Sequence, residues 1–192
     1  MNVLIIYTHP NPNSFNQAIL DTASTTLREG GHTIRIHDLY QMQFHCVLDG
    51  EDLMRNRQGD IHTDIRREQG AVRWAQGLIF IYPIWWFGAP AILKGWIDRV
   101  FTRKFAFDFN ASGMQGLLHH EKALIINTLG GDEASYREKR WHELLVRPMA
   151  EGILHACGVR NISHQAFYQV PTVSHAERQA MLDKVRELTA AF

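Results

Sequence analysis

The chain has 192 residues, enough for one domain with a single substantial hydrophobic core. Apolar residues make up 45% and charged residues 21%, as in ordinary soluble proteins, and 20 basic residues balance 20 acidic ones. A formal net charge of zero argues against general electrostatic attraction to nucleic acid or to an anionic membrane surface. We therefore expect one domain over residues 1–192 and no nucleic-acid partner.

The two cysteines, Cys46 and Cys157, form neither a CxxC pair nor a metal-ligand spacing. We expect both to be reduced thiols, and we expect no metal site. The first residues lack the charged start and apolar length of a signal peptide, and no window approaches the apolar length of a membrane span. These features predict a cytoplasmic location.

The first forty residues predict a strand, a helix and a second strand. Residues 3–7 are a continuous apolar run rich in β-branched side chains, typical of a strand buried on both faces. Two prolines interrupt the following segment, and Asn13 or Ser14 can cap a helix over residues 15–29 that Gly30 and Gly31 end. Alternating residues 33–37 predict the second strand.

The same alternation continues along the chain. Further strands are expected over residues 78–82, 123–127 and 159–167, and further helices over 64–75, 90–100 and 141–157, the last ended by Gly158. Ser174 and Glu177 form a capping box that opens a C-terminal helix. Segments 41–63 and 102–120 look irregular, and such long loops are usually functional or interfacial.

Five strands alternating with helices predict an α/β fold with a doubly wound parallel sheet. For this length, the flavodoxin-like order 2-1-3-4-5 fits better than a six-stranded dinucleotide-binding fold. Ligands of such sheets bind outside the carboxyl ends of the strands, near the switch in strand order. That rule directs attention to three loops, over residues 8–14, 83–89 and 128–136.

The first loop leads into a helix N-terminus, where free N–H groups and the helix dipole attract phosphate. His9, Ser14 and Asn16 add side-chain donors. The chain has no G-x-G-x-x-G and no G-x-x-x-x-G-K-[ST], which argues against a Rossmann dinucleotide site and a P-loop. From the residues alone, Ser14 could equally be only a helix cap and His9 only a turn residue.

The second loop places Trp85, Trp86 and Phe87 directly after a buried strand. Such a cluster is costly to leave in water, so it must pack in the core, at a subunit interface or against a flat ligand. In the third loop, Gly130 and Gly131 let the backbone approach a ligand closely.

Tyr136 and His142 follow the third loop, six residues apart. Tyr136 can donate a hydrogen bond and His142 can supply charge behind it. The alternative is a surface tyrosine and a solvated histidine.

Three motifs together resemble the NAD(P)H:quinone oxidoreductase family, the DT-diaphorases, whose bacterial members include general-stress and potassium-efflux ancillary proteins. They are His9-Pro10 followed by Ser14-Phe15-Asn16-Gln17, the stretch from Phe80 to Val100 that contains Trp86-Phe87-Gly88-Ala89-Pro90-Ala91-Ile92-Leu93-Lys94-Gly95-Trp96, and Gly130-Gly131 with Tyr136 and His142. The resemblance covers nearly the whole chain, and its middle stretch is strongly characteristic.

The resemblance implies a bound flavin, FAD in preference to FMN. Its phosphates would lie near His9, Ser14, Phe15 and Asn16. The remaining implied cofactor residues are Pro83, Ile84, Trp85, Trp86 and Phe87 under the ring, Thr128, Leu129, Gly130, Gly131 and Tyr136 along its edge, Gln69 reaching a partner's flavin across a dimer interface, and Arg178 near the adenine end.

The implied reaction is ping-pong: NAD(P)H passes a hydride to the flavin and leaves, and a quinone, or a nitro or azo compound, then takes its place. The family pattern gives Tyr136, backed by His142, the role of stabilising negative charge on the reduced flavin. Trp86, Phe107 and Phe109 would contact the substrate. Mammalian members carry tyrosines where this chain has Phe107 and Phe109, so substrate preference is expected to differ.

The resemblance also implies a homodimer with shared active sites. The alternative function is a flavin-binding regulatory subunit of a membrane potassium-efflux antiporter. Its docking surface would be loop 41–63, with Met42, Phe44, Val47 and Leu48, although this loop could equally be the dimer interface. A one-electron carrier like flavodoxin ranks last, because flavodoxins are typically acidic and have a Thr/Ser-rich phosphate loop.

Overall fold

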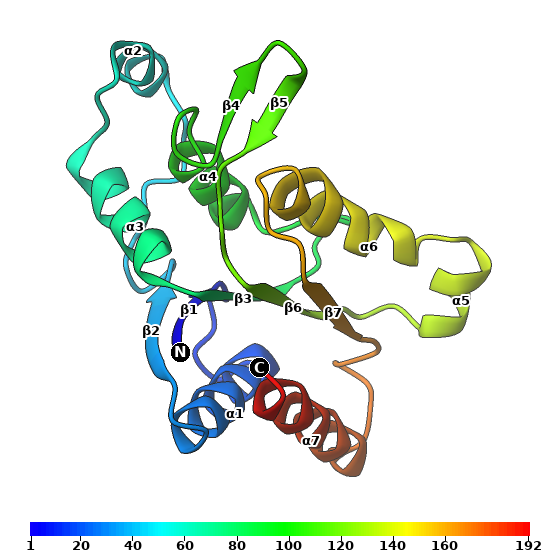
Figure 1. Ribbon diagram of the computed structural model, residues 1–192. Coiled ribbons are helices and arrows are strands. Elements are labelled where there is room, and N and C mark those ends of the chain that lie inside the picture. Colours follow the sequence, from blue (N-terminus) through cyan, green and yellow to red (C-terminus); the bar gives the residue numbers. More distant parts are fainter.

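The computed structural model describes residues 1–192 and contains a five-stranded parallel sheet of order β2-β1-β3-β6-β7 (Figure 1). This is the expected order 2-1-3-4-5 when the strands of this sheet are numbered along the chain. The strands are β1 (Asn2–Tyr7), β2 (Thr33–Asp38), β3 (Gly77–Pro83), β6 (Lys122–Thr128) and β7 (Ile162–Phe167). The flavodoxin-like fold class is therefore confirmed.

Helices cover both faces of the sheet (Figure 1). On one face lie α1 (Phe15–Glu29) and α7 (His175–Ala190), and on the other lie α3 (Thr63–Trp74), α4 (Ala91–Val100) and α6 (His142–Met149). Each face has its own core cluster, and β3 is buried along its whole length. Burial on both faces explains why the central strands are continuous apolar runs rather than alternating ones.

The predicted helix caps are present. The Ser14 hydroxyl accepts the backbone N–H of Gln17 at 3.2 Å and so fixes the start of α1. Ser174 and Glu177 form the expected capping box at the start of α7. Such caps satisfy backbone N–H groups that have no partner inside the helix.

The helix expected over residues 141–157 is interrupted. An α-helical part, α6, ends at Met149, and a π-helical part, η1 (Ala150–His155), follows. Pro148 lies inside α6 and has no N–H to donate, which disfavours regular α-helical hydrogen bonding there. The last strand also begins at Ile162 rather than Val159, after a turn at Gly158 with φ of 110°.

The two segments expected to be irregular contain regular structure. Segment 41–63 holds α2 (Gly50–Gln58), which Asp49 caps, and segment 102–120 holds a hairpin of β4 (Phe107–Asn110) and β5 (Gly113–Gly116). The capping box formed by Asp49 and Asp52 was the sequence signal for α2, which hydrophobic periodicity did not reveal.

The buried Arg99 of α4 holds α2 in place. Its guanidinium donates to both carboxylate oxygens of Asp52, at 2.8 and 3.1 Å, and to Asp64 at 2.8 Å. Phe44, predicted as part of a docking surface, is instead buried in the core, whereas Val47 and Leu48 are exposed. The predicted surface is therefore smaller than the sequence indicated.

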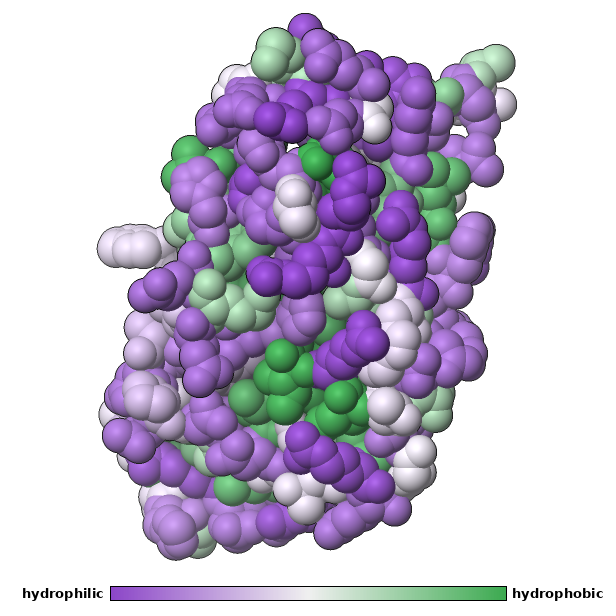
Figure 2. All heavy atoms as spheres, turned by 90° about the vertical axis from the view of Figure 1, so that its left-hand side faces the viewer, coloured by the Kyte–Doolittle hydropathy of each residue, from purple (hydrophilic) through white to green (hydrophobic).

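The side of the molecule that carries α2, α3 and the edge strand β2 is mostly hydrophilic, with one compact hydrophobic patch in its lower half (Figure 2). Edge strands expose unpaired backbone groups, and charged side chains such as Arg35 discourage pairing with other chains. None of the helices has the length and apolar character needed to span a bilayer.

Candidate functional site

The three predicted loops meet at the carboxyl edge of the sheet. Backbone hydrogen bonds join Ile84 N–H to the Thr128 carbonyl at 2.8 Å and Thr8 N–H to the Ile81 carbonyl at 3.0 Å. A fourth loop, after β7, joins them through the Leu129 N–H bond to the Phe167 carbonyl at 3.0 Å. The edge of the sheet therefore brings four separate chain segments into one site.

One part of this site is the N-terminus of α1, where the sequence predicts that a phosphate binds. Asn16 is only 3% exposed, and its Nδ2 donates to Thr128 Oγ1 at 2.7 Å. Asn16 Oδ1 and Thr8 Oγ1 are buried and have no hydrogen-bond partner in the chain. Buried polar atoms without partners are rare and costly, so these two indicate a site for a polar ligand. Thr8 was not predicted, although its place directly after β1 was the available signal.

The aromatic loop has a strained backbone. Trp85 and Gly88 exchange two backbone hydrogen bonds of 3.0 Å, which close a tight turn. Between them, Trp86 and Phe87 have φ of 49° and 60°, a conformation that non-glycine residues rarely adopt and that costs of order 1–3 kcal/mol each. The Trp86 side chain is 97% exposed, so the core-packing alternative does not apply to it.

An aromatic cluster links the second loop to the third. The Phe87 ring lies 5.8 Å from that of Tyr136 and 5.2 Å from that of Trp141, and Tyr168 lies 5.7 Å from Tyr136. A Cβ added to Gly131 would stand 2.4 Å from the Tyr136 ring, so this glycine makes room for the tyrosine. Trp141 and Tyr168 were missed because no local motif marks them.

His142 does not contact Tyr136 through a hydrogen bond. It opens α6, and its Nδ1 is a buried atom without a hydrogen-bond partner. Tyr136 and His142 are therefore not joined by a hydrogen bond, although both follow the same loop. An unpaired ring nitrogen is available for a hydrogen bond with a ligand or a bridging water.

Further predicted cofactor residues lie along the same edge. The His9 ring is 6.3 Å from that of Trp85, and the Phe15 ring is 6.5 Å from that of Phe167. Arg178 donates to the carbonyls of Val170 and Pro171 at 3.1 and 3.3 Å, so it is tied to the loop after β7. The rest of the predicted set follows the strands directly: Pro83 and Thr128 end β3 and β6, and Ile84, Leu129 and Gly130 come next.

Three predicted residues lie elsewhere. Phe107 and Phe109 stand on the projecting hairpin with their rings 5.8 Å apart, and they have no aromatic contact with Phe87. Gln69 is 2% exposed in α3, and its amide donates to the Val100 carbonyl and to Thr102 Oγ1, both at 2.9 Å. Its amide nitrogen is thus bonded within its own chain, and its contact with a partner's flavin stays a prediction.

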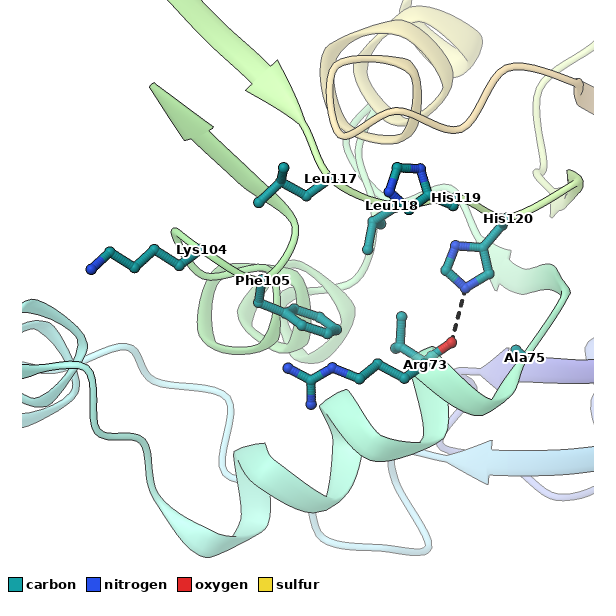
Figure 3. Close-up of a pocket in the computed structure, with 9 residues that line it drawn as sticks. Arg73, Ala75, Lys104, Phe105, Leu117, Leu118, His119 and His120 are labelled. Carbon is teal, nitrogen blue, oxygen red and sulfur yellow. Dashed lines mark hydrogen bonds between the residues drawn. The ribbon is translucent and has the colours of Figure 1, made fainter. Parts of the chain in front are cut away.

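One cavity adjoins this site, and a second cavity lies away from it. One of about 240 Å³ lies between the aromatic loop and α6, and Ile84, Phe87, Leu145 and Met149 contribute apolar walls. Another of about 350 Å³ lies near the opposite edge of the sheet, between the end of α3 and the chain before β6 (Figure 3). None of the predicted site residues lines this second cavity.

The fold is that of a doubly wound α/β protein, and the candidate site lies at the edge of the sheet where ligands of such proteins bind. Residues 1–189 match the model of a family described as having a flavodoxin-like fold. The chain belongs to this family.

Similar proteins and solved structures match nearly the whole chain. An uncharacterised NAD(P)H oxidoreductase of Haemophilus influenzae is 32% identical, covering 100% of this chain and 95% of its own. The human ribosyldihydronicotinamide dehydrogenase [quinone] is 32% identical, covering 94% of this chain and 87% of its own. The solved NAD(P)H:quinone oxidoreductase of Methanothermobacter marburgensis is 29% identical with a TM-score of 0.90, covering 99% and 96%.

Proposed function

We propose that this protein is a flavin-dependent NAD(P)H:quinone oxidoreductase. The observation that carries the proposal is the position of the aromatic loop, which contacts Tyr136 through Phe87 and lies beside His9, in the loop before α1, through Trp85. A flat ring and an anionic phosphate chain are the chemistries that such a pair of features fits. The names of the relatives support the same activity.

The residues present fit a flavin. The unpaired Thr8 Oγ1 and Asn16 Oδ1 supply buried polar atoms, and the start of α1 supplies backbone donors for a phosphate. The aromatic loop would hold the isoalloxazine ring, and the backbone of residues 128–131 would bond its polar edge. We propose FAD rather than FMN, because Arg178 is tied to the adjoining loop 168–173 and would hold the adenine end.

When bound, the flavin would supply hydride transfer between NAD(P)H and a quinone in a ping-pong reaction. The protein supplies orientation and electrostatics. The Tyr136 hydroxyl would donate a hydrogen bond to negative charge that develops at the ring edge, and His142 would supply a proton through its unpaired ring nitrogen. Trp86 and Phe87 would stack with the planar reactants and exclude water.

The oligomeric state and the cellular location are part of the same proposal. We propose a homodimer with shared sites, in which Phe107 and Phe109 stack on the acceptor bound to the partner subunit. We also propose a cytoplasmic location, where NAD(P)H is available and the free Cys46 and Cys157 stay reduced. No specific observation favours the antiporter subunit, so that alternative remains a prediction from resemblance.

Steady-state assays test the proposed activity. The flavin-loaded protein should oxidise one NAD(P)H per quinone reduced, with parallel double-reciprocal plots when both substrates are varied, as a ping-pong reaction requires. Chromatography of the cofactor released on denaturation distinguishes FAD from FMN. If none of a series of quinones, nitro compounds and azo dyes is reduced, the proposal is wrong.

A further inference from the structure

The proposed reaction leaves one part of the site unused, the pair formed by Lys139 and Trp141. Trp141 is partly exposed and packs edge-on against Phe87 at 5.2 Å and Tyr136 at 5.7 Å. The Lys139 Nζ lies 4.5 Å from the centre of the Trp141 ring, within the range of a cation–π interaction. A cation is therefore held directly beside the aromatic cluster of the candidate site.

Lys139 differs from the basic residues around it. Arg137, Arg140 and Arg147 each form a salt bridge, with Glu133, Glu143 and Glu151 respectively. Lys139 has no carboxylate within salt-bridge distance, and the nearby Asp132 accepts a hydrogen bond from the Ser135 N–H at 2.8 Å. The charge of Lys139 is thus available to an anionic ligand.

We propose that Lys139 and Trp141 bind the phosphate-bearing half of the electron donor, with Lys139 on a phosphate and Trp141 against the adjoining ribose or adenine. The inference rests on the proposed function. A nicotinamide stacked beside Phe87 and Tyr136 would have to extend its remaining, charged half toward solvent past the exposed Trp141. The donor would accordingly be a phosphorylated nucleotide of the NAD(P)H class, and not a reduced nicotinamide riboside, which has no phosphate.

Charge reversal tests the role of Lys139. We expect Lys139→Glu to lower the ratio of kcat/KM for NADPH to kcat/KM for reduced nicotinamide riboside by about tenfold, because attraction becomes repulsion. The Kd for NADP⁺, measured by calorimetry on the flavin-loaded protein, should rise by a similar factor. Lys184→Glu is the matched control, since Lys184 lies on α7 across the sheet, and it should leave both values unchanged.

NADH separates the two sources of phosphate. A fall in kcat/KM for NADPH alone would assign Lys139 to the 2′-phosphate. An equal fall in kcat/KM for NADH would assign it to the pyrophosphate. Either result supports the inference. Trp141→Leu should also raise the Kd for NADP⁺, and Trp141→Phe should restore part of the affinity. An unchanged ratio and Kd in Lys139→Glu would overturn the inference while leaving the proposed function intact, whereas a wild-type protein that no donor reduces would refute the proposed function itself.

Discussion

Asn16 and Thr128 are 112 residues apart in the sequence, and their side chains are joined by a buried hydrogen bond of 2.7 Å. The bond connects the start of α1 to the end of β6, two segments that meet at the candidate site. Its donor, Asn16, keeps Oδ1 free for a ligand. Under the proposed function, the same contact would therefore have both a structural and a binding role.

Replacing Thr128 by Val should test both roles, because it removes the acceptor with little change in shape. The amide of Asn16 would be left buried and unpaired, which costs about 1–3 kcal/mol of unfolding free energy. We expect this loss in urea denaturation of the flavin-free protein, together with a higher Kd for the flavin. Thr22→Val, which removes a hydroxyl bonded within α1, should change the flavin Kd little. Equal effects of the two variants on flavin affinity would contradict the account.

Gly131 and Gly130 offer a matched pair of substitutions. An alanine Cβ at Gly131 would stand 2.4 Å from the Tyr136 ring, whereas at Gly130 its nearest neighbour would be Pro171 at 3.8 Å. Gly131→Ala should therefore displace Tyr136 and slow flavin reduction by about tenfold or more, while Gly130→Ala should stay near the wild-type rate. Stopped-flow reduction by NADPH measures both. Similar rates in the two variants would show that the position of Tyr136 does not matter.

Tyr136→Phe and His142→Ala test the proposed chemistry itself. Groups that donate a hydrogen bond or a proton to a developing charge typically contribute 10²–10⁴-fold, so we expect flavin reduction to slow by about 10²-fold. Flavin should remain bound in both variants, which the ratio of flavin to protein absorbance checks. Unchanged reduction rates in both would refute the assigned roles.

His164 predicts a pH dependence of stability. Its Nε2 donates to Asn127 Oδ1 at 2.7 Å, and burial lowers the pKa of His164 to about 4, from an ordinary value of 6.5. Between these pH values the unfolded chain binds the extra proton, so unfolding free energy should fall by up to about 1.4 kcal/mol per pH unit as the solution is acidified from pH 6.5 to 4. His164→Gln should flatten this slope in urea titrations, and His119→Gln, at an exposed position, should not.

The sequence predicted the sheet well because its three central strands are buried on both faces and are continuous apolar runs. Ser14 and Ser174 could be identified as caps because capping depends on neighbouring residues alone. The rule that ligands bind at the carboxyl ends of parallel strands identified the three loops that meet at the candidate site. The length of the helix predicted over residues 141–157 was wrong. Pro148 interrupts the α-helix there, although the apolar pattern continues past it.

Contacts between distant segments could not be predicted. Gln69 is polar, as exposed helical residues usually are. Its side chain is nevertheless buried, and it donates hydrogen bonds to acceptors at the end of α4 and just beyond it. Tyr168 contacts Tyr136 only because the loop after β7 lies beside the segment after β6. Thr8 is distinguished by an unpaired hydroxyl, which only three-dimensional structure reveals.

The most direct test of the central claim is the visible spectrum of the purified protein, reconstituted with FAD or FMN if needed, before and after anaerobic addition of NADPH and then NADH. We expect a bound flavin band that a pyridine nucleotide bleaches and that a quinone restores. A protein that binds no flavin, or whose flavin band neither nucleotide bleaches, would contradict that claim.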